Sequence, residues 1–210
     1  MIRVLIADDH AVVREGLKQI VAENPDMAVA GEAATGHEVL EFVRRQACDL
    51  VLLDLAMPGK DGLDTLKELK TIRPDLPVLI LSVYPEEQYA VRLLRAGAAG
   101  YLTKESAPEE LVAAIRKVST RGKYISASLG EKLAFLLESG TDRPPHESLS
   151  DREYRVMIML ASGKTVTEVA EALYLSVKTV STYRTRALQK LNMRNNAEFS
   201  FYALKQGLLG

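Results

Sequence analysis

The sequence lacks the residues from which cross-links and membrane anchors are built. Among its 210 residues, Cys48 is the only cysteine, which excludes an intramolecular disulfide and a zinc site made of cysteines. The longest apolar runs, such as Val78–Leu81, are far shorter than the roughly 20 residues that span a bilayer. The N-terminus reaches Asp8 and Asp9 before any long apolar stretch, unlike a secretory signal. We therefore expect a cytoplasmic chain without a membrane helix, in which Cys48 is a small core residue.

Neither sign of charge dominates, although the charges are divided unevenly along the chain. The net charge at pH 7 is -1. Residues 1–120 carry 14 basic and 19 acidic residues, whereas residues 146–210 carry 9 basic and 6 acidic residues. An acidic first part suits a cation and a basic last part suits a polyanion, but imbalances of this size are also typical of solvated surface. Composition leaves both interpretations open.

The chain does contain enough apolar residues for folded domains. Hydrophobic residues make up 47% and charged residues 26% of the sequence, so neither a disordered chain nor a fibrous repeat is indicated. The length suits two ordinary domains better than one. We predict a first domain over residues 1–120, a partly helical linker over 121–147 and a second domain over 148–210.

In the first domain, short apolar runs alternate with segments of helical period, which is typical of a parallel sheet. The runs do not alternate with polar residues, as expected for strands covered by helices on both faces. We predict an α/β fold, a doubly wound five-stranded parallel sheet. The expected strands are 2–7, 27–33, 50–54, 78–82 and 100–102, and the expected helices are 11–23, 36–46, 61–73, 86–97 and 108–120.

The remainder of the chain is predicted to be all-helical. The linker, rich in glycine and proline, contains one amphipathic stretch from Leu129 to Leu137. Beyond it, Ser150 and Glu153 have the spacing of a capping box. A tight turn ending at Ser176 joins two helices, the arrangement of a helix-turn-helix. The expected helices are 151–161, 165–173, 177–191 and 195–206.

Three acidic residues stand at the ends of predicted strands. Asp8 and Asp9 follow the first strand and Asp54 closes the third, so a fold that places these strands side by side brings the carboxylates together at the ligand-binding edge. Three like charges repel unless a cation is present, and hard oxygen ligands favour Mg²⁺. Acids that merely cap helices or face water are the alternative interpretation.

Two further strand ends offer what phosphoryl transfer would require. Ser82 ends the fourth strand and Lys104 follows the fifth. A carboxylate can attack a phosphoryl group in line, and a metal, a lysine and a hydroxyl then neutralise and position it. Taken alone, Ser82 would be an ordinary strand-end serine and Lys104 an ordinary surface lysine. We expect both to converge with the acids on one edge of the sheet.

At these residues the chain resembles the receiver domain of two-component response regulators, which has a flavodoxin-like fold. The matching residues, in receiver order and spacing, are Asp8-Asp9, Asp54, Met57-Pro58-Gly59, Gly62, Ser82 and Gly97 to Lys104. The resemblance implies that Asp54 accepts a phosphoryl group from a sensor histidine kinase. It also implies that Mg²⁺ is held by Asp9 and Asp54, by Asp8 mainly through water, and by the backbone carbonyl of Ala56.

The resemblance assigns roles to the other strand-end residues as well. Ser82 would bond the phosphoryl oxygen and Lys104 would neutralise it. Tyr101 matches the aromatic residue that turns inward when the hydroxyl of Ser82 moves, although a packed strand tyrosine remains an alternative. His10 belongs to the familiar Asp-Asp-His opening, and we assign it no phosphoryl role.

The second helix of the predicted helix-turn-helix is basic. From Ser176 to Arg194 there are five basic residues and no acidic one. The apolar stripe of Val177, Val180, Leu188 and Leu191 predicts an opposite, outer face that carries Lys178, Ser181, Thr182, Thr185 and Arg186. Hydroxyls and cations suit a DNA groove, where phosphates supply most of the affinity and base edges the sequence choice.

Residues Leu149 to Leu209 resemble the DNA-binding domain of LuxR/NarL-type transcription factors. The match includes Ser150 to Glu153, Glu168 to Ala170, and Leu175 to Val180 with Thr182. The resemblance implies base contacts from Ser181, Thr182 and Thr185, and phosphate contacts from Lys178, Thr179, Tyr183, Arg184 and Lys190. In this family the last helix often forms a dimer on DNA, and Phe199, Tyr202 and Ala203 are candidates, although core packing explains them as readily.

The sequence thus predicts a transcriptional response regulator that phosphorylation of Asp54 switches, with Mg²⁺ as cofactor and promoter DNA as target. Its expected partners are a sensor histidine kinase, a second copy of the chain when active, and RNA polymerase as a further candidate. A phosphatase acting through Asp54 is one alternative, but Ala56 stands where such enzymes carry a second acid, so we expect no enzyme. A protein-binding module that has lost DNA contact is another alternative.

Overall fold

The structure, a computed structural model, describes residues 1–126, 129–131, 134 and 144–209. These residues form two compact units, Met1–Gly130 and Glu131–Gly210. We describe each unit by itself. Most of the predicted linker helix over Leu129–Leu137 lies outside the described residues. No helix among the described residues is long and apolar enough to cross a membrane.

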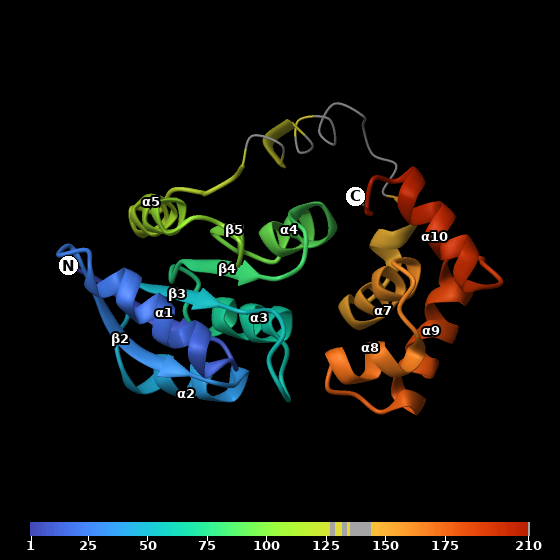
Figure 1. Ribbon diagram of the computed structural model, residues 1–210, viewed down its shortest axis with the longest axis horizontal. Helices are drawn as coiled ribbons and strands as arrows, with labels where there is room; N and C mark the ends of the chain where they lie inside the picture. Colours follow the sequence, from blue (N-terminus) through green and yellow to red (C-terminus); the bar gives the residue numbers. More distant parts are fainter. Residues whose placement is uncertain (127–128, 132–133, 135–143, 210) are drawn as a thin grey trace. The chain divides into compact units, whose positions relative to one another are not determined.

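The first unit is a five-stranded parallel sheet with helices on both sides (Figure 1). The strands are β1 (Ile2–Ala7), β2 (Met27–Ala33), β3 (Leu50–Leu53), β4 (Val78–Ser82) and β5 (Gly100–Thr103). The helices are α1 (Ala11–Ala22), α2 (Gly36–Arg45), α3 (Gly62–Ile72), α4 (Glu86–Arg95) and α5 (Pro108–Ser119). The predicted doubly wound α/β fold is confirmed, with bounds that differ from the expected ones by only one or two residues.

The strand order β2-β1-β3-β4-β5 decides where a ligand site can form. The chain leaves β1 toward β2 on one side and returns to β3 on the other, so the order reverses between β1 and β3. Ala7 is paired with Leu53 at the ends of these two strands. The residues that follow them, Asp8 and Asp54, therefore emerge side by side from the carboxyl edge of the sheet.

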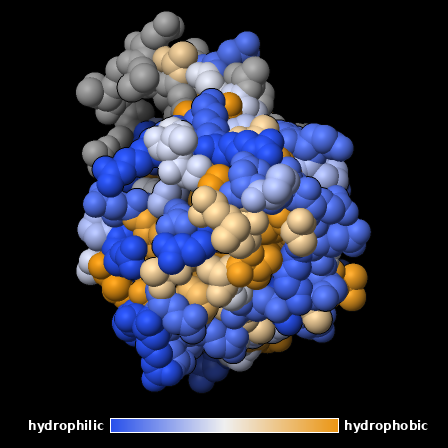
Figure 2. Space-filling view, turned by 90° about the vertical axis from the view of Figure 1, so that its left-hand side faces the viewer, coloured by the Kyte–Doolittle hydropathy of each residue, from blue (hydrophilic) through white to orange (hydrophobic). Residues whose placement is uncertain are grey.

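The sheet is held between two apolar layers. Leu17 and Val21 of α1 and Leu111 and Ile115 of α5 pack on one face, and α2 packs against α3. All five residues of β4 are buried, because helices cover both faces of the strand. On the face of the first unit shown in Figure 2, hydrophilic residues surround a smaller central area of apolar residues.

The second unit is helical. It comprises a short 3₁₀ helix, η1 (Pro145–Ser148), followed by α7 (Asp151–Ala161), α8 (Val166–Ala172), α9 (Val177–Lys190) and α10 (Asn196–Lys205). Helix α7 is buried from Glu153 to Ala161 and contacts α8, α9 and α10. The predicted capping box of Ser150 and Glu153 is present. The remaining helices therefore pack around α7, and the predicted small all-helical domain is confirmed.

A substitution at Gly62, the first residue of α3, tests how tightly the backbone is packed against Asp54. A β-carbon at this position would collide with the carbonyl oxygen of Asp54 and lie 2.6 Å from the Cα of Leu55. We expect Gly62→Ala to lower the free energy of unfolding by about 1–3 kcal/mol, the usual cost of overpacking. Urea unfolding measures this change.

Gly16 is the matched control, because a β-carbon there would meet no atom within 4 Å. Gly16 lies inside α1, so Gly16→Ala should raise the free energy of unfolding by about 0.5–1 kcal/mol. Equal stability changes in the two variants would contradict the assigned packing at Gly62.

Candidate functional site

Three carboxylates meet at the carboxyl edge of the sheet. Asp8 and Asp54 are each 1% exposed, and the Asp9 side chain is 13% exposed. One potential ligand atom from each of Asp8, Asp9, His10 and Asp54 lies within 4.8 Å of the others. The predicted convergence of the three acids is therefore confirmed, in a group that could hold a metal ion.

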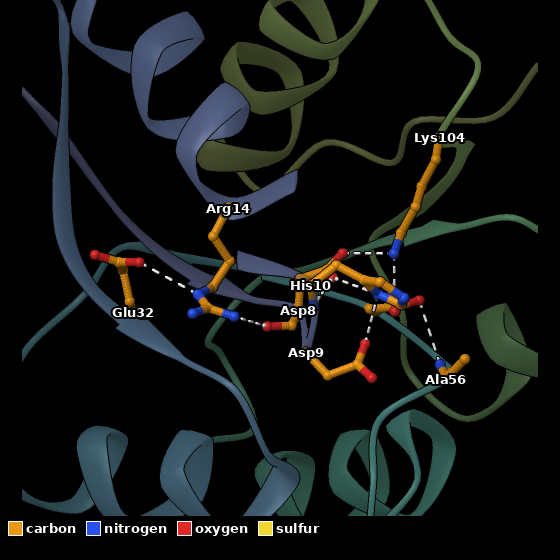
Figure 3. A network of polar contacts seen from close by, with 8 residues as sticks. Asp8, Asp9, His10, Arg14, Glu32, Ala56 and Lys104 are labelled. Carbon is orange, nitrogen blue, oxygen red and sulfur yellow. Dashed lines mark hydrogen bonds and ion pairs between the residues drawn. The ribbon is translucent and has the colours of Figure 1, made fainter. Parts of the chain in front are cut away.

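Lys104 reaches into this group from the end of β5 (Figure 3). Its Nζ lies 2.9 Å from Oδ2 of Asp54 and 2.5 Å from Oδ2 of Asp8. Burial raises the pKa of Asp54 above its usual value, and Lys104 opposes that rise. Burial acts to lower the pKa of Lys104, but the two carboxylates outweigh it and raise the pKa. One cation thus faces two buried carboxylates, and the pocket favours further positive charge.

The backbone and Ser82 complete the edge. The amide of Ala56 donates a hydrogen bond to Oδ1 of Asp54 at 3.2 Å, and the role of its carbonyl as a metal ligand stays a prediction. Ser82 is fully buried, and its Oγ accepts a hydrogen bond from the amide of Tyr84 at 3.2 Å. The amide of Lys104 donates to the carbonyl of Ser82. This pairing of β4 with β5 fixes Ser82 and Lys104 on the same edge.

Tyr101 points inward from β5. Its side chain is buried, and its hydroxyl donates to the carbonyl of Tyr84 at 2.7 Å. Burial raises the pKa of this phenol above its ordinary value. The ring is thus packed in this conformation, and its hydroxyl contacts the loop between Ser82 and α4. A role as a switch stays a prediction.

Sequence reasoning missed the support around Asp8. The His10 amide donates to Oδ1 of Asp8 at 2.8 Å, and the His10 Nδ1 lies 2.8 Å from Oδ1 of Asp9. Arg14 donates to the carbonyl of Asp8 at 2.7 Å and pairs with Glu32 on β2. Arg14 lies one turn after His10, a spacing that places both at the start of α1 beside the strand end, and this signal could have identified it.

The beginning of the predicted linker is attached to the first unit. The amide of Tyr124 donates to the carbonyl of Ala99 at 2.9 Å, and Tyr124 forms a parallel bridge with Gly100 of β5. The Tyr124 hydroxyl donates to Glu110 on α5 at 2.8 Å. The Ser126 hydroxyl donates to Glu86, the first residue of α4, at 2.5 Å. The chain after α5 thus contacts β5 and both helices that flank it.

Helix α9 carries the basic segment of the second unit. The Ser176 Oγ caps it by accepting from the amide of Thr179 at 3.0 Å. Val180, Ala187 and Leu188 are buried. The predicted outer residues Lys178, Ser181, Thr182, Thr185 and Arg186 are all exposed, whereas Thr179, Tyr183 and Arg184 are partly exposed.

The prediction of an apolar stripe was wrong for one residue. Val177 was expected to be buried, but it is 49% exposed. It has the same helical phase as the buried residues, yet it is the first residue of α9. Helical period fixes the side of a helix on which a residue lies, but it does not fix how far along the helix the packing extends.

Two of the cations predicted to hold DNA phosphates have partners within the second unit. Lys190 lies 2.6 Å from Oε2 of Glu153, a buried carboxylate on α7. Burial acts to raise the pKa of Glu153, but the hydrogen bonds from Lys190 and Ser150 outweigh it and lower the pKa. Arg184 donates to the side chain of Asn196 at 2.7 Å. These contacts join α9 to α7 and to α10.

Comparison with known proteins identifies both units. Residues 4–116 match the family model of the response regulator receiver domain. Residues 147–203 match the model of bacterial regulatory proteins of the luxR family. A receiver and a luxR-type domain in one chain are the domains of a DNA-binding transcription regulator. The chain belongs to the two-component response regulators of the NarL/FixJ family.

The relatives match along the whole chain. Response regulator UvrY of Escherichia coli is 38% identical over 209 residues, covering 99% of this chain and 96% of UvrY. Response regulator GacA of Pseudomonas aeruginosa is 37% identical, covering 100% of this chain and 98% of GacA. Among solved structures, RcsB of Salmonella enterica serovar Typhimurium, bound to the promoter rprA with a phosphomimetic, has a TM-score of 0.65 at 26% identity. That match covers 96% of this chain and 97% of RcsB.

Glu153 provides a pH test of the second unit. Because its pKa is lowered by folding, its charge stabilises the folded state above its unfolded value of 4.5, and this contribution is lost as the pH falls through the folded pKa. We expect Glu153→Gln to lower the free energy of unfolding at pH 7 by about 1–2 kcal/mol, since the cap and the ion pair both weaken.

Denaturant unfolding at several pH values measures this difference between wild type and Glu153→Gln. The difference should shrink as the pH falls below 4.5. Glu171, an exposed acid on α8, supplies the control variant Glu171→Gln. A difference that stays constant with pH would contradict the assigned charge interaction.

Proposed function

We propose that Asp54 is the phosphoacceptor of this response regulator and that its phosphorylation by a sensor histidine kinase controls promoter binding. The observation that supports this most directly is a buried Asp54 carboxylate beside Asp8 and Lys104. A carboxylate oxygen of Asp54 attacks the phosphorus atom while the phosphorus–nitrogen bond to the kinase histidine breaks. The Asp54 carboxylate thus gains the phosphoryl group, and the imidazole is the leaving group. Ser82 donates a hydrogen bond to the new phosphoryl oxygens, and Lys104 neutralises their charge.

The residues present fit Mg²⁺ as the cofactor. Three of the four potential ligand atoms in this tight group are carboxylate oxygens, and the fourth is a ring nitrogen of His10. Hard cations prefer the oxygen donors. Asp9 and Asp54 would hold the ion directly, Asp8 through water, and Ala56 through its backbone carbonyl. When bound, Mg²⁺ neutralises charge on the transferred phosphoryl group. Lys104 then needs to balance fewer carboxylate charges and becomes available to the phosphoryl oxygens.

A chain of contacts leads from this pocket toward the linker. Ser82 and the hydroxyl of Tyr101 both contact Tyr84, in the loop before α4. Two residues later, Glu86 accepts from Ser126 of the linker. A phosphoryl group that draws Ser82 toward Asp54 would alter the hydrogen bond to Tyr84 and hence the start of α4. We propose that the linker transmits this change to DNA binding.

The exposed face of α9 suits a DNA groove. Ser181, Thr182 and Thr185 would approach base edges, and Lys178, Thr179, Tyr183, Arg184 and Lys190 would contact phosphates. Lys190 would share its charge between Glu153 and DNA, because its side chain remains 43% exposed. The solved RcsB complexes contain promoter DNA, which supports the same use of this domain.

We propose domain limits of 1–120 for the receiver, 121–147 for the linker and 148–210 for the DNA-binding domain. The family matches at 4–116 and 147–203 lie within or close to these limits. We place the protein in the cytoplasm, with the DNA on which it acts, and keep RNA polymerase as a further candidate partner. We propose no catalytic turnover, because Ala56 occupies the place of the general acid that dedicated phosphatases use.

The central test compares DNA affinity with and without beryllofluoride and Mg²⁺. Wild type should change its affinity for a selected duplex by about 5-fold or more, the usual range of allosteric coupling, and Asp54→Ala should not respond. Asp49→Ala is the matched control, because Asp49 stands before β3, at the opposite edge of the sheet, and pairs with Arg3. Electrophoretic mobility shifts measure the affinities. An equal response in Asp54→Ala and wild type would refute Asp54 as the acceptor.

The same preparation separates the alternative functions. Multiple turnover of phosphate esters would favour an enzyme. Salt-independent or absent DNA binding would favour a protein-binding module, because phosphate contacts impose a steep dependence on salt.

The surface of α10 supports a homodimer, with a corrected set of contact residues. Phe199 and Ala203 are fully buried in the second unit, and Tyr202 contacts His146, so core packing explains these candidates. Phe201 and Leu204 are instead 73% and 61% exposed, and Ala197 is exposed one turn earlier. RcsB has been solved as dimers on DNA, which supports a dimer here when the protein is active.

We expect Phe201→Ser to weaken the dimer on DNA, because it removes the largest exposed apolar side chain of α10. Analytical ultracentrifugation of the protein with a duplex carrying two half-sites should show a 1:1 complex where wild type forms a 2:1 complex. Lys164→Ala, at an exposed residue between α7 and α8, should retain the 2:1 complex. A 2:1 complex of undiminished stability in Phe201→Ser would exclude this surface.

A further inference from the structure

The loop between β3 and α3 presents two of the proposed metal ligands. It covers residues 54–61 and carries the carboxylate of Asp54 and the backbone carbonyl of Ala56. The Gly62 amide donates to the carbonyl of Leu55 at 3.1 Å and closes the loop at its base. Because Ala56 lies inside the closed segment, the order of this segment affects where the Ala56 carbonyl is presented.

The closed segment has few side chains that could hold it by polar contacts. From Leu55 to Lys60, Lys60 is the only residue with a polar side chain. Gly59 adopts a φ of 76°, and a β-carbon there would meet no atom within 4 Å. Glycine loses more conformational freedom on folding than any other residue. An attachment beside Gly59 therefore restricts the part of the loop that has the most freedom.

Lys60 provides this attachment through its side chain. Its Nζ donates a hydrogen bond to Oε2 of Glu68 on α3. The other carboxylate oxygen of Glu68 accepts from Arg44 on α2 at 3.0 Å. The hydrogen bond from Lys60 lowers the pKa of Glu68, so this carboxylate is charged at neutral pH. The side chains of Lys60 and Glu68 are 23% and 34% exposed, and their ion pair is thus partly shielded from solvent.

The backbone of Lys60 is held at the same place. A β-carbon on Gly36, the first residue of α2, would lie 2.8 Å from the Lys60 carbonyl oxygen and 3.2 Å from the Lys60 Cβ. Lys60 therefore packs its backbone against α2 and extends its ammonium group to α3. The two helices pack on each other, so together they offer a fixed base for the loop.

We propose that Lys60 is a positioning residue for the metal site, whose ion pair with Glu68 holds the loop so that the Ala56 carbonyl is presented to Mg²⁺. Ligands that are held in place before binding give a higher affinity, because less freedom is lost when the ion arrives. The proposal rests on the proposed use of Mg²⁺ at this site. It adds a residue that acts through the loop rather than as a ligand.

The sign of the effect separates this role from simple electrostatics. A cation that acts only through its charge repels Mg²⁺, so removing Lys60 would strengthen metal binding and removing the charge of Glu68 would weaken it. If the pair positions the loop, both removals weaken metal binding. Removing both partners should weaken it no more than removing either one, because each change breaks the same pair.

The test titrates the full-length chain with MgCl₂, without a phosphoryl donor, and follows the backbone amide resonances by NMR. At low ionic strength, Lys60→Met and Glu68→Gln should each weaken Mg²⁺ binding by about 3-fold, the size expected for a partly exposed ion pair. The double variant should also lose about 3-fold. Lys60→Arg keeps the cation and should lose less than about 1.5-fold. Without metal, the heteronuclear NOE of Gly59 should fall in Lys60→Met, because the loop gains fast motion.

Arg45 and Glu41 supply the matched controls. They form an ion pair within α2 at 2.7 Å, and neither belongs to the loop. Arg45→Met and Glu41→Gln remove the same charges as the test variants, and each should change the Mg²⁺ affinity by less than about 1.5-fold. Glu68→Gln tests the pair from α3 even if Lys60→Met fails to fold.

The outcomes separate this role from the proposed function. Wild type without Mg²⁺-dependent shifts at Asp8 and Asp54 overturns the metal site, and the role of Lys60 with it. Wild type that binds Mg²⁺ while Lys60→Met binds it equally or more tightly overturns only the role of Lys60. Losses that add in the double variant, or equal losses in the control variants, exclude the ion pair as the cause.

Discussion

The charge balance at the carboxyl edge of the sheet is the interaction on which the other features depend. Asp8 and Asp54 are buried side by side, and the single ammonium group of Lys104 lies within 2.9 Å of both. Without that cation, two buried like charges would repel at close range and favour protonation. With it, the pocket still has more carboxylate than positive charge, since Asp9 lies in the same group. A site of this kind favours a divalent cation, and any anionic group that joins Asp54 must redistribute the contacts of Lys104.

This redistribution has a short route to the rest of the first unit. Ser82 ends β4, and Lys104, directly after β5, donates its amide to the Ser82 carbonyl. The loop after Ser82 is held by hydrogen bonds from Tyr84 and Tyr101. The loop leads into α4, whose first residue also holds the linker through Ser126. The close approach of Tyr124 to β5 requires glycine at position 100, where a β-carbon would lie 2.8 Å from the Tyr124 backbone oxygen. The linker start is therefore part of the face that contains Tyr101, and the proposed coupling needs no long-range displacement within this unit.

In the second unit, α9 both packs against the other helices and carries the exposed hydroxyl and basic side chains. The Glu153 carboxylate accepts a hydrogen bond from the Ser150 amide at the start of α7 and another from Lys190 of α9. A partly buried ion pair therefore fixes α9, the helix with the exposed hydroxyls, to the central helix α7. Its outer face is then rigidly presented by the fold rather than by a loop. Val177, the first residue of α9, adds an exposed apolar side chain to this helix, while the exposed Phe201 and Leu204 lie on α10. In the proposed function, DNA contact and self-association therefore use different helices of one small bundle.

Local patterns in the sequence determined the elements, their order, the parallel sheet and the convergence of Asp8, Asp9 and Asp54. The physical reason is that apolar period reports secondary structure, and the carboxyl ends of parallel strands share one edge. The same patterns placed the hydroxyl and basic face of α9 correctly. Only the tertiary structure decided that Lys104 pairs with both Asp8 and Asp54, that Arg14 supports the Asp8 backbone, and that Lys190 is held by Glu153. It also decided that Val177 is exposed and that Phe199 belongs to the core. These features depend on which side chains from distant segments meet, and on where packing ends along a helix, and neither is encoded in the period of a single segment.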